Sequence, residues 1–486
     1  MSGDILIGGT AGQQLSLKAG YANRHGLIAG ATGTGKTVTL QVLAEGFSRL
    51  GVPVFLADVK GDLSGLCCAG TPHHKIDERL QSIGITDFQQ ASSPVAFWDL
   101  FGERGIPVRS TISEMGPQLL AALLELNETQ ESILILAFEF ADDEGLLLVD
   151  LNDLRTTLSY LAEHGRELGS QFAVSKASVN AILRRLLMIE REGGDLFFGE
   201  PALSLNDLLR TDRQGRGVIN ILSAERLIQS PRLYSTFLLW LLSELFEQLP
   251  EIGDPEQPEL VFFFDEAHLL FNSAPKALLE KIEQLVRLIR SKGVGVYFIT
   301  QSPADIPDSV LGQLGNRIQH ALRAYTPKEQ KAVRVAAQSF RPNPELDTEA
   351  AISVLGVGEA LVSVLSEGGV PTPVQRLLIA PPASRIGPAQ QQERDQVLGD
   401  SPLQRRYGES FDPESAHEEL LRRVERQEQN EQRVQAEESR RRNSAAGRTG
   451  RSRESAGEAF LKSLARSAGS SVGRRLLRGL LGSLLK

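Results

Sequence analysis

The sequence is poor in cysteine, with only the adjacent pair Cys67 and Cys68 in 486 residues. One neighbouring pair cannot supply the disulfide framework of a small secreted domain, so we expect a chain from the reducing cytoplasm. No group of histidines and cysteines at ligand spacing accompanies the pair, so we do not expect it to bind a metal. Both are expected to be small, partly buried side chains.

The sequence also lacks a hydrophobic run long enough to cross a membrane. Its most apolar stretches, such as FLLWLLSELF at 237–246, have about half of the roughly 20 residues that a transmembrane helix needs. The first residues, MSGDILIGGT, show no charged leader followed by an apolar run, so we expect no signal peptide. A composition of 41% hydrophobic and 23% charged residues is typical of a globular protein.

Basic residues outnumber acidic ones only at the end of the chain. Residues 440–486 hold twelve Lys or Arg and two Glu, a balance of +10, which leaves −19 on the preceding 439 residues. An acidic body does not favour coating by nucleic acid. We therefore expect any nucleic-acid phosphates to be bound by the basic tail or inside a channel.

Strand-like and helix-like patterns alternate along most of the chain, which predicts an α/β fold with a mainly parallel sheet and helices on both faces. The character changes to helical between about 105 and 200 and becomes polar after about 385. We therefore expect a core in two parts, 1–104 and 201–385, a helical insertion at 105–200, a polar and partly disordered linker at 386–455, and a basic amphipathic helix at 456–486.

One stretch matches the phosphate-binding pattern G-x-x-x-x-G-K-[ST] in full: GATGTGKT, which follows a strand-like run and precedes a helical one. Its glycines let backbone N–H groups converge on phosphate oxygens at a helix N-terminus. Lys36 is expected to reach the β- and γ-phosphates, and the Thr37 hydroxyl to bind Mg²⁺. The residues predicted to bind ATP are Gly30, Ala31, Thr32, Gly33, Thr34, Gly35, Lys36, Thr37 and Val38.

A second motif, VFFFDEAH at 261–268, places two carboxylates after a buried strand. Asp265 is predicted to hold Mg²⁺ through water, and Glu266 to polarise the water that attacks ATP. A third strand, GVGVYFITQ, ends in Gln301, which is predicted to contact the γ-phosphate or that water. The letters DEAH do not indicate a DEAH-box helicase, because the chain has no room for a second tandem core, and His268 is expected to have a structural or sensing role.

Phosphoryl transfer also needs positive charge beyond Mg²⁺ and one lysine, often from an arginine finger. The candidates are Arg287, opposite the apolar side of the helical run 276–293, Arg290, near the end of that run, and Arg317. The structural alternative, a solvated or structural charge, stays open for each of them. Because the chain has a single P-loop, a finger comes either from the same subunit or from another copy, which favours a ring.

Taken together, these segments, with FLADVKGDLSG, VINILSAE and LGQLGNRIQHALRA, resemble the HerA/FtsK class of P-loop ATPases, and most closely the bacterial HerA-like family typified by YjgR. The resemblance covers about residues 1–385. It implies a RecA-like core, a hexameric ring and ATP-driven movement of double-stranded DNA. It also implies motor roles for Lys36, Thr37, Asp265, Glu266 and Gln301, the finger position for Arg290, and an acidic strand-end motif at Asp58 and Asp62.

Three functions remain open on the sequence alone. The first is a ring-forming DNA translocase or helicase-like ATPase, with Lys328, Lys331 and Arg334 as possible DNA contacts or simply a solvated helix face. The second is an ATP-driven machine that acts on protein or membrane-associated partners through its basic, leucine-rich tail. The third is a nucleotide switch, in which hydrolysis only times an interaction.

Overall fold

The computed structural model describes residues 3–10, 12–169, 174–273 and 276–446. The chain divides into two units, Met1–Leu420 and Leu421–Lys486. In the second unit, the described residues form the rest of helix α17 (Ala416–Ala446), whose described side chains are mostly exposed. The amphipathic helix predicted at 456–486 lies outside the described residues.

The first unit is built on one sheet, which has twelve strands among the described residues, in the order β2-β1-β12-β11-β10-β3-β9-β8-β4-β7-β5-β6. The strands are β1 (Asp4–Thr10), β2 (Gln13–Lys18), β3 (Gly26–Ala29), β4 (Val54–Asp58), β5 (Val95–Asp99), β6 (Ile106–Pro107), β7 (Ile219–Ser223), β8 (Leu260–Phe264), β9 (Val294–Thr300), β10 (Asn316–Gln319), β11 (Glu359–Ser363) and β12 (Gln375–Ile379).

The sheet has a parallel part and an antiparallel margin. From β10 to β6 every neighbouring pair of strands is parallel. From β10 through β11, β12 and β1 to β2 every pair is antiparallel. The predicted α/β class with a mainly parallel sheet is therefore confirmed, and the antiparallel margin adds the chain's first two strands to its last two.

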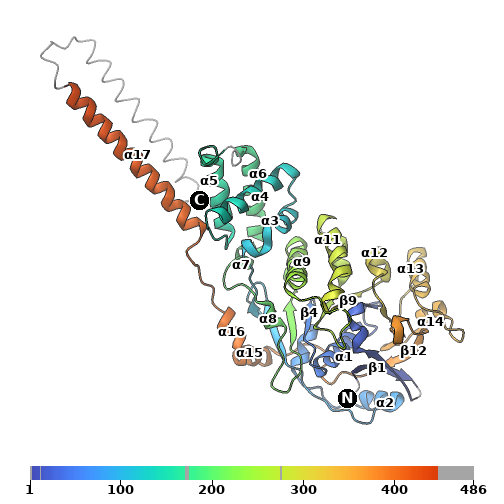
Figure 1. Cartoon of the computed structure of the whole chain (residues 1–486). Coiled ribbons are helices and arrows are strands. Elements are labelled where there is room, and N and C mark those ends of the chain that lie inside the picture. The colour runs from blue at the N-terminus through green and yellow to red at the C-terminus, as the bar shows by residue number, and fades with distance from the viewer. Residues whose placement is uncertain (1–2, 11, 170–173, 274–275, 447–486) are drawn as a thin grey trace. The chain divides into compact units, whose positions relative to one another are not determined.

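Helices cover both faces of this sheet, as predicted (Figure 1). The α-helices are α1 (Lys36–Arg49), α2 (His74–Ile83), α3 (Ile112–Leu123), α4 (Glu128–Asp143), α5 (Leu151–Leu168), α6 (Lys176–Ile189), α7 (Asp195–Phe197), α8 (Leu205–Leu208), α9 (Pro231–Gln248), α10 (Ala267–Ser273), α11 (Lys276–Leu288), α12 (Asp308–Leu311), α13 (Pro327–Gln338), α14 (Thr348–Val354), α15 (Gln391–Asp400), α16 (Pro402–Tyr407) and α17. Among the described residues, none of the helices is both long and apolar enough to span a bilayer.

The three phenylalanines of β8 show why this strand is buried on both faces. Side chains alternate across a strand, and Phe263 packs against Phe47 of α1 while Phe262 packs against Phe55, which in turn contacts Phe237 of α9. Helices α1 and α9 therefore lie on opposite faces of the sheet. Burial on both faces leaves only the end of β8 open for polar side chains.

The stretch at 105–200 holds helices α3 to α7, and its first residues form the short strand β6 beside β5. Side-chain caps begin three of its helices, at Thr111, Asn127 and Asp150. Helix α3 contacts both α9 and α11, so this stretch packs beside the helices on one face of the sheet.

Residues 391–420, which the sequence predicts to lie in a polar linker, belong to the first unit and pack beside strand β5. Tyr407 is fully buried and lies edge-on to Trp98 of β5, with ring centroids 5.6 Å apart. The guanidinium of Arg394 lies 4.8 Å from the ring centroid of Phe97. The few groups that are buried here are scattered among polar residues, so the composition of the segment conceals its packing.

Candidate active site

The candidate site lies where four neighbouring parallel strands end: β3, β9, β8 and β4. Ala29 of β3 pairs with Thr300 of β9, and Phe264 of β8 pairs with both Phe298 of β9 and Ala57 of β4. Because parallel strands present their carboxyl ends at the same edge, the residues that follow them meet there. These are the P-loop, Gln301, the pair Asp265–Glu266, and the turn after Asp58.

The P-loop adopts a conformation that its glycines make possible. Gly33 and Gly35 have φ of 78° and 117°, a region that other residues rarely occupy. A Cβ on Gly30 would lie 2.5 Å from the Cβ of His320, so this position also requires glycine. Helix α1 begins at Lys36, and its first backbone N–H groups have no partner within the helix, which suits them to bind an anion.

Lys36 is buried beneath this loop, where its ammonium donates to the carbonyl oxygens of Gly30 (2.6 Å) and Ala31 (3.1 Å). Burial lowers the pKa of Lys36, and the nearby Lys60 ammonium lowers it further, against the opposite effect of Glu266 and Asp265. A cavity of about 250 Å³ opens beside it. Its lining comes from the P-loop and from three other segments, and consists of Thr32, Gly33, Gly35, Lys36, Thr37, Val38, Lys60, Asp265 and Val357.

Asp265 and Glu266 are both nearly inaccessible to solvent, at 9% and 4% exposure. Burial, with the neighbouring Glu266, raises the pKa of Asp265 to about 7. Burial acts on Glu266 in the same sense, but Lys60, His268 and Gln301 together outweigh it and leave the pKa of Glu266 below its usual value. Glu266 also has φ of 49°, a strained conformation for a non-glycine residue that is typical of functional sites.

Lys60 also belongs to this site, although the sequence patterns did not predict it. Its ammonium forms an ion pair with Oε1 of Glu266. Oε2 of the same carboxylate lies 3.5 Å from Nε2 of Gln301 and 3.3 Å from Nδ1 of His268. In the sequence Lys60 stands just after a buried strand, in DVKGD, but nothing there shows which carboxylate it contacts.

Asp58 holds the turn that carries Lys60. Its carboxylate accepts hydrogen bonds from the backbone N–H groups of Lys60 (3.3 Å), Gly61 (2.8 Å) and Leu63 (3.0 Å). Burial raises the pKa of Asp58 to about 6, although these hydrogen bonds oppose the shift. Asp62 begins the 3₁₀ helix that follows, at Asp62–Cys67.

The candidate arginines lie away from the P-loop of their own chain. Arg290 precedes β9, at the end of that strand opposite to Gln301, and its Nη2 donates to Asp254 at 2.9 Å. Arg287 is exposed on α11. Arg317 donates to three backbone carbonyls, of Leu314, Ser339 and Leu311, at 2.8–3.1 Å. These contacts are those of a structural residue, so the structure gives no support to a catalytic role for Arg317.

The residues of the site suit Mg²⁺ held jointly with a nucleotide. Among the described residues, no cluster of three or more His, Cys, Asp or Glu could hold a metal by itself. Mg²⁺ in nucleotide sites takes only one or two protein ligands, and substrate phosphates and water supply the rest. The Thr37 hydroxyl, on the cavity wall, and the buried carboxylate of Asp265 are ligands of that kind.

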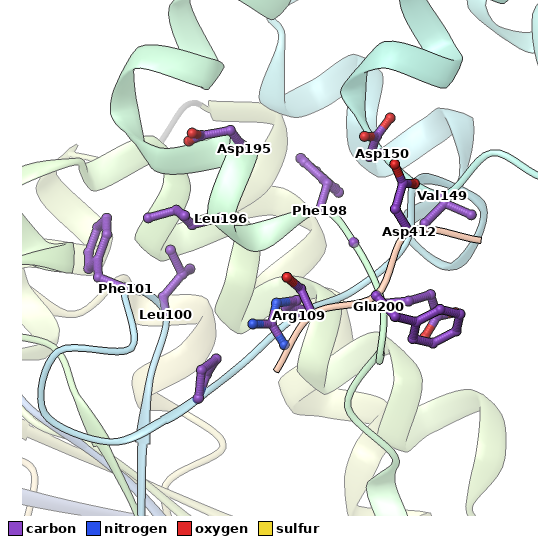
Figure 2. Close-up of a pocket in the computed structure, with 14 residues that line it drawn as sticks. Leu100, Phe101, Arg109, Val149, Asp150, Asp195, Leu196, Phe198, Glu200 and Asp412 are labelled. Carbon is purple, nitrogen blue, oxygen red and sulfur yellow. The ribbon is translucent and has the colours of Figure 1, made fainter. Parts of the chain in front are cut away.

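A second cavity, of about 350 Å³, lies near β5, β6 and α7 (Figure 2). Four carboxylates are among its lining residues, from Asp150, Asp195, Glu200 and Asp412. Arg109 also lines it, but its Nη1 donates to the carbonyl oxygen of Tyr407 at 2.9 Å. This excess of negative charge would repel a triphosphate, so the nucleotide belongs in the smaller cavity at the P-loop.

The model of the family Helicase HerA-like C-terminal matches residues 4–486. The chain belongs to this family. Two curated relatives are both described as DNA double-strand break repair helicase HerA. The protein of Saccharolobus solfataricus is 22% identical over 380 residues, which are 74% of this chain and 66% of the relative. That of Sulfolobus acidocaldarius is 21% identical over 379 residues, 74% and 67% of the two chains. The match to the first relative thus spans slightly less than two thirds of its length.

Solved structures with partial similarity include VirB4 of Thermoanaerobacter pseudethanolicus, at 16% identity and a TM-score of 0.49, with coverage of 81% of this chain and 99% of that one. Another is the plasmid coupling protein TrwB in complex with the ATP analogue ADPNP, at 17% identity and a TM-score of 0.48, with coverage of 75% and 89%.

Proposed function

We propose that this HerA-like protein is an ATPase that uses hydrolysis to drive a ring-shaped motor along double-stranded DNA. One observation supports the ATPase activity above all: a complete P-loop lies together with Asp265, Glu266 and Gln301 at the ends of four adjacent strands. A phosphate cradle alone would bind nucleotide. A buried carboxylate beside it, hydrogen-bonded to a glutamine, adds the means to activate water.

In the proposed reaction, the P-loop N–H groups and Lys36 hold the β- and γ-phosphates, and Thr37 and Asp265 hold Mg²⁺. Bound Mg²⁺ would neutralise phosphate charge as it develops. Glu266 takes a proton from the attacking water. The water oxygen forms its bond to the γ-phosphorus while the bond from that phosphorus to the β,γ-bridging oxygen breaks, which gives ADP and phosphate. Gln301 orients the water.

The ring is proposed because, within the described part of the chain, the three candidate arginines lie away from the P-loop of their own subunit. Arg290 stands at the opposite edge of the sheet from the P-loop and remains partly exposed, at 40% of its side chain. A neighbouring copy could present it to the P-loop, and a closed cyclic assembly would repeat this contact at every site. We propose six subunits from the resemblance to the HerA/FtsK class, and a cytoplasmic location from the small number of cysteines.

Duplex DNA is proposed as the substrate from family membership and from basic side chains on α13. Lys331 and Arg334 are exposed there, although Arg334 also lies 3.7 Å from Glu349. The test is the ATPase rate with and without duplex DNA, measured at low and moderate salt. Stimulation that falls as salt rises supports a DNA motor. A rate that duplex DNA leaves unchanged at both salts would contradict it and favour a protein or membrane partner.

A further inference from the structure

In this structure the catalytic carboxylate is closed off from the cavity where it would act. Glu266 is 4% exposed, and Lys60, Gln301 and His268 surround its two oxygens. A water poised to attack a phosphate needs one of those oxygens. The Lys60 ammonium forms an ion pair with Oε1, and a carboxylate in an ion pair is a weaker proton acceptor than a free one. Departure of Lys60 would therefore make Glu266 a stronger base and open Oε1 to water.

Lys60 is well placed to reach a second anion. Its side chain is 45% exposed and lines the cavity together with the P-loop residues Thr32 and Thr37. Its charge also acts on the buried Lys36 ammonium, so two ammonium groups lie near the same small volume. The turn beneath Lys60 is fixed by the three backbone hydrogen bonds of Asp58. Only the flexible lysine side chain has to move.

We propose that Lys60 exchanges one anion for another: it pairs with Glu266 when the site is empty and with the γ-phosphate when ATP is bound. This role rests on the proposed ATPase function. The exchange frees Glu266 only when a γ-phosphate is present. ATP binding would therefore activate the site, and Lys60 would pair with Glu266 again after phosphate leaves. Lys60 thereby supplies, from the same subunit, positive charge at the phosphoryl group that Lys36 alone does not provide.

The alternative is a purely structural lysine, which neutralises a buried carboxylate and never touches nucleotide. The two roles differ in how Lys60 affects ATP relative to ADP, because only ATP has a γ-phosphate. They also differ in whether the effect of Glu266 on ADPNP binding depends on the presence of Lys60. A double-mutant cycle measures that dependence directly.

The experiment measures the dissociation constants of ADP and of the non-hydrolysable analogue ADPNP, both with Mg²⁺, for wild type, Lys60→Ala, Glu266→Gln and the double variant. Lys60→Ala should weaken ADPNP binding about tenfold, which is the loss expected for one charge-assisted hydrogen bond, and should change the affinity for ADP little. Glu266→Gln should strengthen ADPNP binding severalfold, because Lys60 no longer has to break an ion pair. In the Lys60→Ala background this gain should disappear.

Two controls complete the design. Lys60→Arg keeps the charge and should restore part of the preference for ADPNP, and Lys75→Ala, on an exposed lysine of α2, should change neither constant. Thermal melting checks that each variant folds.

Equal weakening of ADP and ADPNP by Lys60→Ala would overturn the proposal, because Lys60 would then only shape the site. It would also be overturned if the gain from Glu266→Gln survived in the double variant, since Glu266 would then act on phosphate by itself. Other results would contradict the proposed ATPase function itself. In that case wild type would bind neither nucleotide, or Lys36→Ala would bind both as tightly as wild type.

Discussion

At the scale of single residues, buried ionisable side chains fall into two groups. Lys36 and Asp265 line the cavity at the P-loop, and Asp58 and Glu266 lie beside it at the ends of β4 and β8. His25 lies instead at the start of β3 and is part of the framework: its Nε2 bonds to the carbonyl oxygen of Val286 at 2.7 Å, and its Nδ1 accepts from the N–H of Val296 at 3.0 Å. Both contacts require the neutral ring with its proton on Nε2.

This framework histidine leads to a prediction about pH. Burial lowers the pKa of His25 from 6.5 to about 4 in the folded chain. The unfolded chain therefore binds more protons between these pH values, and His25 destabilises the fold as pH falls through that window. Asp58 and Asp265 have raised pKa values, so they stabilise the fold as pH falls and oppose the effect of His25. The effect of His25 alone is given by the difference in unfolding free energy between wild type and His25→Asn.

We expect the destabilisation caused by His25→Asn to shrink by about 1–2 kcal/mol between pH 6.5 and pH 5. Asparagine is chosen because it tolerates the φ of 56° at this position. Urea unfolding of both proteins at several pH values gives the free energies. A difference that stays constant across the window would mean that His25 titrates normally in the folded protein.

At the scale of elements, sequence patterns predicted individual strands better than their pairing. Runs such as the one ending at Phe264 are continuous and apolar, so most strands of the parallel part could be recognised from the sequence. The pairing of β1 with β12 joins Gly8 to Ile379, and no local pattern reports a contact across such a separation. Strands β5, β6 and β12 were not predicted, and the sequence placed α15 and α16 in a polar linker.

The packing of α15 and α16 can be tested by truncation. A chain that ends at residue 388 loses Tyr407 and Arg394, which cover Trp98 and Phe97 of β5. Removal of one buried aromatic side chain costs about 3–5 kcal/mol, so the melting temperature should fall by roughly 5 °C or more. A chain that ends at residue 446 keeps these helices and should melt like the full chain. Equal melting of both truncated chains would contradict this packing.

For the site, too, some residues could be predicted from the sequence and others only from the fold. The P-loop, Asp265, Glu266 and Gln301 could be predicted because each stands directly after a recognisable strand. Lys60 could not, since its role depends on an ion pair between the ends of β4 and β8, and strand adjacency is not written in the sequence. Arg317 was a candidate for the arginine finger, and its three contacts with backbone carbonyls became visible only in the fold.

At the scale of the whole molecule, the proposed ring depends on Arg290 acting in a neighbouring subunit. Lys36→Ala and Arg290→Ala should each lose ATPase activity alone. When the two are mixed and allowed to exchange subunits, an intact P-loop will meet an intact arginine at roughly a quarter of the sites in a randomly mixed ring. The mixture should therefore regain about that share of the wild-type rate.

Two results would count against this arrangement. If Arg290→Ala kept the wild-type rate, Arg290 would not be the finger. If both variants were inactive and the mixture stayed inactive after exchange, the arginine would not act between subunits. Lys331→Ala, an exposed charge on α13, serves as the control and should leave the rate without DNA unchanged.

The central claim is that the four strand ends form a site that hydrolyses ATP. The most direct measurement is the Mg²⁺-dependent release of phosphate from ATP by wild type and by Glu266→Gln, purified in the same way, with the exposed Glu256→Gln as a matched control. We predict that Glu266→Gln binds ATP but hydrolyses it about 100-fold more slowly or worse, while Glu256→Gln matches wild type. Equal rates for wild type and Glu266→Gln would contradict the claim.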